Sequence, residues 1–486
     1  MKLVWKGRSW EPGVAQSGHK EGHRTRVLER SGPREEPLYR PASRLIHGDT
    51  LDVAAALHAE GLARKAQLVY VDPPYFSQAD YASEARLDGP ADGRVRRATA
   101  YRDKWTGDDD GVAAYLDMLA PRLEALASLV APEGSLWVQL DWRAAYLARV
   151  ILDEIFGRGG FKNEIVWKRA PNLGRQAASG QFGRTLDTLL VYGGPGARIV
   201  PPTRKEPIEP SAIRWDEEGR PFTSAPRGDY TDASIAKLDA EGRVHRTASG
   251  KVYIKYFLVK DDEGNLCRER RVDALWTDVA PLRHAQTKER TGYPTQKPLS
   301  LLVRVVACAT QPGDLVVDLF AGSGTTGEAA HRLGRRSILG DAAPLAIATA
   351  RARLLRADAE LSVESVDSDE APHGAPPEVK ISRGEGDSVE VELIEPREPL
   401  AWAIDDAPEQ GAPFHVAWHD ERTPGARAVA ARTMATLDAT SAEVSVTVYE
   451  DDGVIRAGKF PVPARSGKKK ESMKGRDRAA RGVTRA

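Results

Sequence analysis

The strongest constraint on the fold is a Gly-rich turn between an apolar strand and a helix, at Leu315–Gly327. Leu315–Val317 predicts a buried strand, and Thr326–Leu333 predicts the start of the following helix. Glycines in such a turn let the backbone approach a ligand, and a helix N-terminus favours its polar or anionic end. A strand, a Gly-rich turn and a helix in this order indicate an α/β fold with a mostly parallel sheet.

The composition of this turn indicates which ligand it binds. Gly322, Gly324 and Gly327 formally satisfy the dinucleotide fingerprint G-x-G-x-x-G, but that fingerprint alone is weak. Asp318 lies inside the strand and the glycines begin several residues later, which suits S-adenosylmethionine better than a pyrophosphate. No Gly-Lys-Ser/Thr follows, so a phosphate loop is excluded. Asp341 follows the next strand-like run, where a ribose diol is usually held.

A second predicted strand, Leu68–Val71, runs into Asp72, Pro73, Pro74 and Tyr75. Prolines have no N–H, so the backbone must leave the sheet and present its carbonyls and side chains. The Asp72 carboxylate and the Pro73 carbonyl are two neighbouring acceptors, and Tyr75 adds an aromatic plane. This set suits a planar base with an exocyclic amino group. Taken alone, the tetrapeptide also fits a Pro-Pro turn with a surface Tyr.

The third motif, Gly292–Leu299, directly precedes a predicted helix at Leu301–Ala309. Pro298 is well placed to start that helix. Lys297 at the helix start is positioned to meet a carboxylate. By itself, this motif fits a capped helix start with a solvated Lys equally well.

The three motifs, in this order, resemble the amino-group DNA methyltransferases of the β arrangement, especially the branch with modification subunits of type III restriction systems. That family has D-P-P-Y, then a target-recognition insert, then T-Q-K-P, then F-x-G-S-G. Here these are Asp72–Tyr75, residues 161–290, Thr295–Pro298 and Phe320–Gly324. Weaker stretches also match, such as Tyr101–Trp105. The resemblance covers roughly residues 44–356, with the small departure that Gly340 directly precedes Asp341.

The resemblance implies a permuted Rossmann-like methyltransferase fold, with a seven-stranded, mostly parallel sheet and S-adenosylmethionine as cofactor. It implies that Asp72 and the Pro73 carbonyl accept hydrogen bonds from the target amino group, beside Pro74. Tyr75 would stack on a flipped-out base. The positions implied for the cofactor site are Asp49, Lys297, Asp318, Phe320, Gly322, Gly324, Thr325 and Asp341. Among these, Asp341 would hold the ribose, Lys297 would lie near the methionine carboxylate, and Asp49 near the adenine.

In this family D-P-P-Y goes mostly with adenine, so the expected reaction is methylation of adenine N6 in DNA by a site-specific enzyme of a restriction-modification or related system. Cytosine N4 is the alternative base. Three other functions stay open: a dinucleotide-dependent oxidoreductase, a DNA-binding protein with a degenerate methylase site, and methyl transfer to RNA or protein.

The net charge of +0 over 486 residues seems to argue against DNA, but it is a cancellation. Residues 161–300 carry 24 basic and 18 acidic groups, residues 351–465 carry 12 and 23, and residues 466–486 carry 8 and 2. The basic segment suits phosphate contacts and base reading, although a solvated charged face is the alternative. The predicted DNA contacts are Trp167, Lys168, Arg169, Arg175 and Arg184.

The chain shows no apolar run long enough for a membrane helix and no signal peptide. Cys267 and Cys308 build neither a disulfide framework nor a metal site, so a reducing cytoplasm is expected. Double-stranded DNA is the expected partner, and the resemblance adds a restriction subunit and a second copy of the chain as candidates.

The sequence predicts six regions. They are an irregular arm (1–43), a catalytic half (44–160), a target-recognition insert (161–290), a cofactor half (291–358), an acidic linker with a β-rich appendage (359–465) and a basic disordered tail (466–486).

Overall fold

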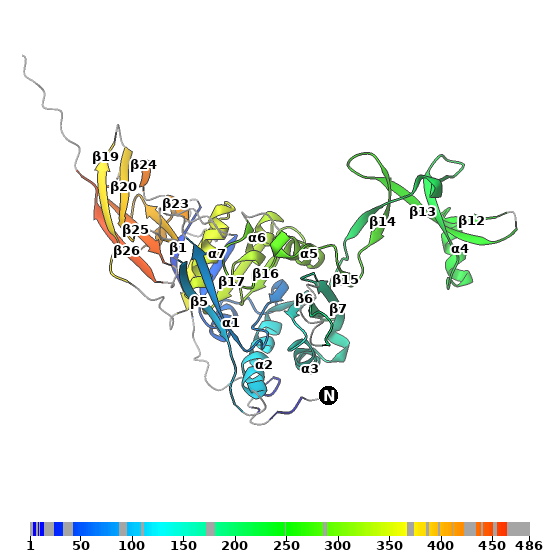
Figure 1. The fold of residues 1–486 in the computed structure, drawn as a ribbon, viewed down its shortest axis with the longest axis horizontal. Helices are drawn as coiled ribbons and strands as arrows, with labels where there is room; N and C mark the ends of the chain where they lie inside the picture. The colour runs from blue at the N-terminus through cyan, green and yellow to red at the C-terminus, as the bar shows by residue number, and fades with distance from the viewer. Residues whose placement is uncertain are drawn as a thin grey trace, which may run out of the picture.

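In the computed structural model the described residues are 3–5, 8, 10–13, 24–32, 42–86, 95–107, 111–171, 180–247, 249–284, 289–366, 374–384, 388–396, 399–410, 412–421, 434–438, 441–450 and 454–463. They form a central α/β body, a module that projects from one side of it, and a β-rich module on the other side (Figure 1). None of the described helices is long and apolar enough to cross a membrane.

Among the described residues, the central sheet has eleven strands in the order β15-β7-β8-β6-β3-β16-β17-β2-β18-β1-β22. Neighbours from β6 to β18 are all parallel, whereas β8 is antiparallel to both of its neighbours. In chain order the strands are β1 (Thr25–Arg30), β2 (Ser43–His47), β3 (Ala66–Val71), β6 (Val130–Leu140), β7 (Phe161–Lys168), β8 (Leu186–Gly193), β15 (Leu275–Trp276), β16 (Leu315–Asp318), β17 (Arg336–Asp341), β18 (Leu361–Val366) and β22 (Phe414–His415).

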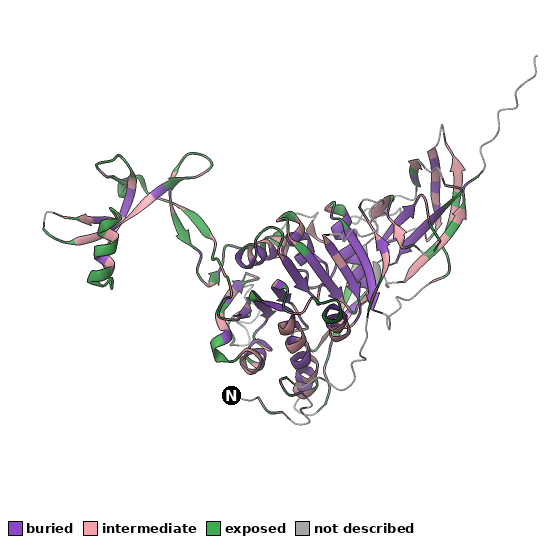
Figure 2. Ribbon diagram, turned by 180° about the vertical axis from the view of Figure 1, so that it is seen from behind, coloured by how far each residue is buried: buried purple, intermediate pink, exposed green. Residues whose placement is uncertain are grey.

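Helices cover both faces of this sheet, whose strands are largely buried (Figure 2). Strand β3 faces both layers, because Val69 and Val71 pack with α1, α2 and α3, while Leu68 and Tyr70 pack with α5 and α6. Helix α7 covers β17, β2 and β18 on the face that α6 covers. The helices are α1 (Thr50–Ala59), α2 (Val112–Leu129), α3 (Ala145–Phe156), α5 (Leu299–Ala309), α6 (Thr325–Arg332) and α7 (Pro344–Arg356).

The order of the strands places a crevice at one edge of the sheet. Strands β3 and β16 are parallel neighbours; the chain leaves β3 toward β6 and leaves β16 toward β17, in opposite directions. Ligands of open α/β sheets bind beyond the carboxyl ends of strands at such a switch point. The two motifs that follow β3 and β16 therefore meet at one edge.

The sheet differs from the prediction in its size, because the expected count was seven strands. Strands β7, β8 and β15 come from the segment predicted as the insert, and β18 and β22 from the predicted appendage. Strand β1 lies in the arm predicted to be irregular, and Trp10 of that arm is fully buried. The continuous apolar run at Leu189–Tyr192 is the pattern of a central strand covered on both faces, which the separation by polar stretches concealed.

The projecting module spans roughly residues 201–272, so it is narrower than the predicted insert (Figure 1). Its small apolar core joins Ile235, Val244 and Ile254, and much of its surface is exposed (Figure 2). Its elements are β9 (Thr203–Pro207), β10 (Arg214–Trp215), β11 (Pro221–Pro226), α4 (Asp232–Ala240), β12 (Val244–Arg246), β13 (Val252–Lys260) and β14 (Leu266–Arg271).

The C-terminal module contains two further sheets around a core that includes Val391, Trp402 and Val446. One sheet joins β19 (Glu378–Arg383), β20 (Ser388–Glu395) and β24 (Met434–Asp438). The other joins β23 (Trp418–Glu421), β21 (Ala401–Asp405), β25 (Glu443–Tyr449) and β26 (Ile455–Pro461). Strand β22 adds to the central sheet through β1. The tail predicted at 466–486 lies outside the described residues.

A separate hairpin, β4 (Ala79–Arg86) and β5 (Val95–Asp103), follows the Asp72–Tyr75 motif. Its second strand ends beside the crevice, and Ala100 on it packs in a buried cluster with α7. The hairpin therefore forms one wall of the crevice.

Candidate active site

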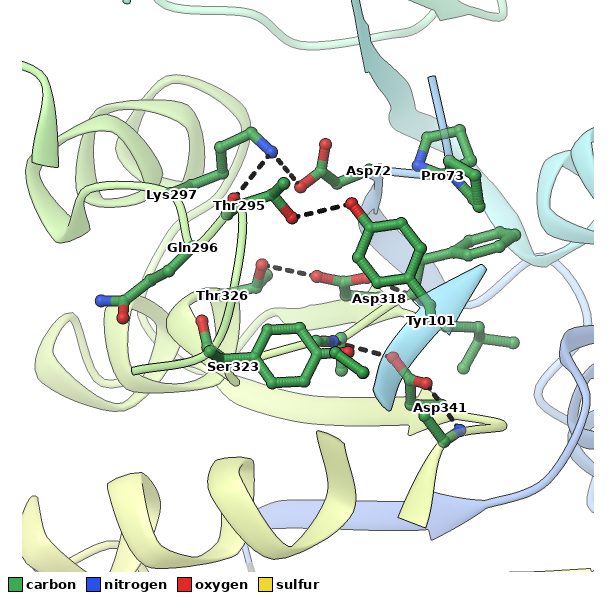
Figure 3. Close-up of a pocket in the computed structure, with 18 of the residues that line it drawn as sticks. Asp72, Pro73, Tyr101, Thr295, Gln296, Lys297, Asp318, Ser323, Thr326 and Asp341 are labelled. Atoms are coloured by element: carbon green, nitrogen blue, oxygen red, sulfur yellow. Dashed lines mark hydrogen bonds and ion pairs between the residues drawn. The ribbon is translucent and has the colours of Figure 1, made fainter. Parts of the chain in front are cut away.

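A cavity of about 340 Å³ lies at the carboxyl edge of β3, β16 and β17. It brings together the end of β3, the segment before α5, the Gly-rich turn and the start of α1 (Figure 3). Residues predicted for the catalytic and cofactor sites that line it are Asp49, Asp72, Pro73, Pro74, Tyr75, Lys297, Asp318, Phe320, Gly322, Thr325 and Asp341. Gly324 does not line the cavity but caps α6 behind it.

Asp72 is held by two side chains at once. The Tyr75 hydroxyl donates to Oδ1 of Asp72 at 2.7 Å, and the Lys297 ammonium donates to Oδ2 (Figure 3). Lys297 Nζ also lies 5.1 Å from the centroid of the Tyr75 ring. Burial raises the pKa of Tyr75 well above its usual value, so the phenol stays a donor at neutral pH. Lys297, predicted near a cofactor carboxylate, thus pairs with the Asp72 carboxylate in this structure.

Asp103 fixes the loop that carries Tyr75, and its role was not predicted. Its carboxylate is buried and accepts hydrogen bonds from the backbone N–H groups of Tyr75, Phe76 and Ser77, at 2.7 to 3.1 Å. It also accepts from the indole N–H of Trp105 at 2.8 Å. The sequence contained a signal, since Tyr101–Trp105 matches the family, but nothing in that pattern assigned Asp103 to this loop.

The Gly-rich turn is shaped by Asp318. Its Oδ1 accepts from the Phe320 N–H at 3.0 Å, and its Oδ2 accepts from the Thr326 hydroxyl at 2.6 Å, so it ties both ends of the turn. Burial raises its pKa to about 7, against the opposing effect of these hydrogen bonds. Gly322 and Gly324 have φ values of +50° and +74°, which side-chain-bearing residues rarely adopt.

Asp341, at the end of β17, points a carboxylate toward the same turn. It accepts from the N–H groups of Gly322 and Ala343, each at 2.9 Å (Figure 3). Burial raises its pKa above the usual value, although these backbone donors oppose that effect. A carboxylate has about four acceptor positions, so hydroxyl groups of a ligand can still bind here.

Two further predicted residues join the walls of the cavity. Asp49 caps α1 by accepting from the Leu51 N–H at 2.9 Å, and its second oxygen pairs with Arg122. The Thr325 hydroxyl donates to the Lys297 carbonyl at 3.3 Å, which links the Gly-rich turn to the segment before α5.

Aromatic residues that the sequence did not single out complete the cavity. Tyr101 and Tyr81 of the hairpin stack with ring centroids 4.7 Å apart, and the Tyr101 hydroxyl lies 3.0 Å from the Thr295 hydroxyl (Figure 3). Tyr293 lies so close to the Gly-rich turn that a Cβ on Gly322 would be 3.3 Å from its ring. The cavity therefore has flat aromatic walls as well as acceptors.

A buried polar chain runs from the cavity floor. The Tyr70 hydroxyl donates to Gln139 Oε1 at 2.7 Å, and Gln139 Nε2 donates to Asp187 Oδ2 at 3.0 Å. Arg169 pairs with the other oxygen of Asp187 at 2.6 Å. Burial raises the pKa of Asp187 to about 6, with Lys297 and Arg169 acting in the opposite direction.

The predicted DNA contacts have mixed outcomes. Trp167 is wrong as a surface contact, because it is only 3% exposed and its indole donates to the Val279 carbonyl at 3.0 Å. The alternating burial along β7 turns this side chain into the core. Arg169 is paired with Asp187, whereas Lys168 and Arg184 are more accessible. Arg175 lies outside the described residues.

Comparison with known proteins places the chain in a family. The N6/N4 methyltransferase family model, DNA methylase, matches residues 66–351, which is more than half of the chain. The chain therefore belongs to the N6/N4 DNA methylase family, whose cofactor is S-adenosylmethionine. The predicted resemblance is confirmed, and so is its link to type III modification subunits.

Relatives at about a quarter identity include both type II and type III methyltransferases. The chain is 27% identical to type II methyltransferase M.EcaI of Enterobacter cloacae, covering 63% of this chain and 67% of that protein. It is 27% identical to the StyLTI Mod subunit of a type III restriction-modification enzyme from Salmonella typhimurium, covering 59% of this chain and 49% of that subunit. The chain thus spans about half the length of that subunit.

Solved structures with a similar chain include the M1.HpyAVI-SAM complex, with a TM-score of 0.35 and 17% identity, covering 64% of this chain and 98% of that chain. Another is TTHA0409, a DNA modification methylase of Thermus thermophilus complexed with S-adenosyl-L-methionine, with a TM-score of 0.36 and 19% identity, covering 68% and 99% of the two chains.

Proposed function

We propose that this chain is a site-specific DNA methyltransferase that transfers a methyl group from S-adenosylmethionine to adenine N6. The observation that carries the proposal is that the Asp72–Tyr75 motif and the Gly-rich turn with Asp341 line one cavity. Acceptors for an amino group and a site for an adenosyl cofactor are thereby brought within reach of each other. Family membership supports the reaction class, and the D-P-P-Y motif favours adenine.

The cavity fits the cofactor. The turn at Gly322 leaves backbone exposed beside the Tyr293 ring, where a Cβ would crowd the space. Asp341 supplies acceptors suited to ribose hydroxyls, and Phe320 and Tyr293 supply apolar walls. S-adenosylmethionine supplies the methyl group that is transferred. We assign Asp49 and Lys297 to the cavity ends where the adenine and the methionine carboxylate would lie.

Asp72 would act by orientation. Its carboxylate and the Pro73 carbonyl would accept the two hydrogens of the target amino group, which directs the nitrogen lone pair toward the methyl donor. Tyr75 and Lys297 keep the carboxylate in place for this role. The Tyr75 ring would stack on a base that has left the duplex.

Double-stranded DNA is the proposed substrate, with the 161–290 region as its reader. A restriction subunit is a proposed partner, supported by the type III Mod relatives. Dimerisation and a cytoplasmic location stay predictions from the sequence.

The test is transfer of a labelled methyl group from S-adenosylmethionine to bacterial DNA by the full chain, compared with Asp72→Ala. We expect the variant to lose at least about a hundredfold in rate while it still binds the cofactor, because Asp72 acts on the acceptor. A carboxylate control is Asp80→Ala, since Asp80 is exposed in a pair with Lys104. An unchanged rate in Asp72→Ala would overturn the assigned mechanism.

The base is decided by digesting the product DNA to nucleosides and identifying the methylated one by mass spectrometry. N6-methyladenosine is expected, and N4-methylcytidine would replace adenine with the alternative base. Label in RNA or protein instead of DNA would reject the substrate class.

A further inference from the structure

A cluster of exposed aromatic and basic side chains lies on the rim next to the cavity. We call it the rim patch, defined as Trp142, Arg143, Tyr146, Phe182, Arg184 and Leu186. Phe182 is 98% exposed, and Trp142, Tyr146 and Leu186 are also among the most exposed large apolar side chains of the described residues. Such a concentration of apolar surface in one place is typical of an interaction site.

The rim patch lies at the same edge of the sheet as the cavity. Val71 pairs with Val138 in the parallel strands β3 and β6, so Trp142 leaves β6 on the side where Asp72 leaves β3. Leu140 pairs with Thr188 of the antiparallel strand β8, so the residues before β8 reach the same edge. A bond from Arg169 to the Arg184 carbonyl, at 3.4 Å, joins the patch to Asp187 beneath the cavity.

The patch combines stacking surfaces with a positive charge. The Arg184 guanidinium lies 4.0 Å from the centroid of the Trp142 ring, and that of Arg143 lies 4.9 Å from it. Arg143 is neutralised by Asp141, but no carboxylate of the described residues forms an ion pair with Arg184. Arginine on an aromatic face, beside further exposed rings, is the surface that unpaired nucleotides bind.

The distribution of charge points to the same place. Residues 161–200 contain six Lys and Arg against two Asp and Glu, whereas the projecting module at 201–272 contains 14 against 13. The positive charge of the predicted insert is therefore concentrated in the segment that carries Arg184. Phosphate binding requires such an excess, and the nearly neutral projecting module lacks it.

We propose that the rim patch binds the DNA strand that flanks the displaced target base. Arg184 contacts a phosphate of that strand, and Phe182 and Trp142 stack on the bases or sugars that base displacement exposes. This inference rests on the proposed function, because it names the surface that holds the DNA while the target occupies the cavity.

The test compares three versions of the full chain, namely the wild type, Phe182→Ala with Arg184→Ala in one chain, and Arg158→Ala. Arg158 is an exposed basic residue just before β7, at the opposite edge of the sheet, and so serves as the control. Dissociation constants are measured by fluorescence anisotropy with a labelled duplex that contains a position modified by the wild type. Cofactor affinity is measured by calorimetry.

We expect the double variant to bind the duplex about tenfold or more weakly, with a salt dependence reduced by about one ion, while cofactor affinity stays unchanged. Arg158→Ala should bind DNA like the wild type. Equal DNA affinity of the double variant and the wild type would overturn the proposal. So would a change only in the sedimentation mass of the chain, which would make the patch a protein interface.

The outcomes separate this inference from the proposed function. If the wild type binds the duplex but methylates none of its bases, the proposed function fails, and the comparison of DNA affinities still judges the patch. If the wild type methylates DNA and the double variant keeps its affinity, only the patch assignment fails.

Discussion

The ammonium group of Lys297 donates a hydrogen bond to Oδ2 of Asp72, and so joins the segment before α5 to the end of β3. These two residues are far apart in the sequence, and each belongs to a different motif. The pair makes Lys297 a positioning residue for the Asp72 carboxylate, in addition to its proposed place near the cofactor.

The first prediction separates these two roles. Lys297→Ala should lower the single-turnover rate of methyl transfer by about tenfold or more even with saturating cofactor, because Asp72 loses a charge-assisted hydrogen bond. Lys104→Ala, which breaks an exposed pair with Asp80, is the control and should leave the rate unchanged. Full recovery of the rate at high cofactor concentration would mean that Lys297 serves only the cofactor.

The second prediction concerns Asp103. Asp103→Ala removes the acceptor of three backbone N–H groups and one indole, which are then left without that partner. We expect a loss of about 2 kcal/mol or more in the free energy of unfolding, measured with urea. The Tyr75 loop should also shift, so the transfer rate of the folded variant should fall. Asp103→Asn, which keeps one acceptor oxygen, should lose less of both; equal losses would contradict the assigned contacts.

The third prediction compares two glycines with similar backbone angles. A Cβ on Gly324 would lie 2.7 Å and 2.8 Å from the Cβ and Cα of Ala350, whereas a Cβ on Gly313 would meet nothing within 4 Å. Both have positive φ, so both alanine variants carry strain, but only Gly324→Ala adds a backbone clash. We expect Gly324→Ala to destabilise the chain by at least about 1 kcal/mol more than Gly313→Ala in thermal or urea unfolding. Equal losses would show that the turn yields to the added methyl group.

The sequence predicted the elements that lie close to the two motifs. An apolar run followed by D-P-P-Y, and another followed by glycines, place Asp72 and Asp341 at one sheet edge without any long-range information, since carboxyl ends of parallel strands share an edge. The weak points were strands that the chain interrupts. The runs of β7 and β8 are separated by polar residues, so sequence spacing assigned them to the insert, whereas their pairing with β6 decides their place.

The partners of individual side chains could not be predicted in the same way. Asp103 reaches the Tyr75 loop because the hairpin folds back on it, and Trp167 is buried because β7 lies inside the sheet. Both outcomes depend on tertiary packing, which composition and periodicity do not encode. The concentration of charge in residues 161–200 was readable from the sequence, but the interrupted strands hid its position on the rim.

The fourth prediction uses the ionisation of Asp318. Its pKa, raised by burial to about 7, exceeds the value of about 3.9 for an exposed Asp. Between these values the folded chain binds more protons at Asp318 than the unfolded chain, so the stability contributed here falls as the pH rises. Asp318→Asn does not titrate. The difference in free energy of unfolding, wild type minus variant, should therefore decrease from about pH 5 to about pH 7 and then level off.

Urea unfolding of both proteins at a series of pH values measures this difference, and groups that titrate identically in both proteins cancel. A difference that is constant over the range would show that Asp318 is already ionised in the fold at low pH. A difference that grows with rising pH would give the opposite sign and contradict the burial of the carboxylate.

The last prediction concerns the joint between the C-terminal module and the body. Glu29 of β1 pairs with Arg351 of α7 at 2.7 Å and accepts a hydrogen bond from the Tyr449 hydroxyl of β25, all of them buried. Glu29→Ala leaves the Arg351 guanidinium without this carboxylate, and removing one partner of a buried pair costs about 3 kcal/mol or more. Asp239→Ala, which breaks a half-exposed pair with Arg246, is the control and should cost less than about 1 kcal/mol.

The joint also reaches the active site, because Tyr449, Leu400 and Ala401 share a buried cluster with Tyr293, which lines the cavity. Glu29→Ala should therefore weaken cofactor binding, measured by calorimetry on the folded variant, whereas Asp239→Ala should not. Unfolding losses that are equal in the two variants would mean that the module is only loosely attached. A large loss of stability with unchanged cofactor affinity would confine the effect to the joint and leave the cavity wall independent of the module.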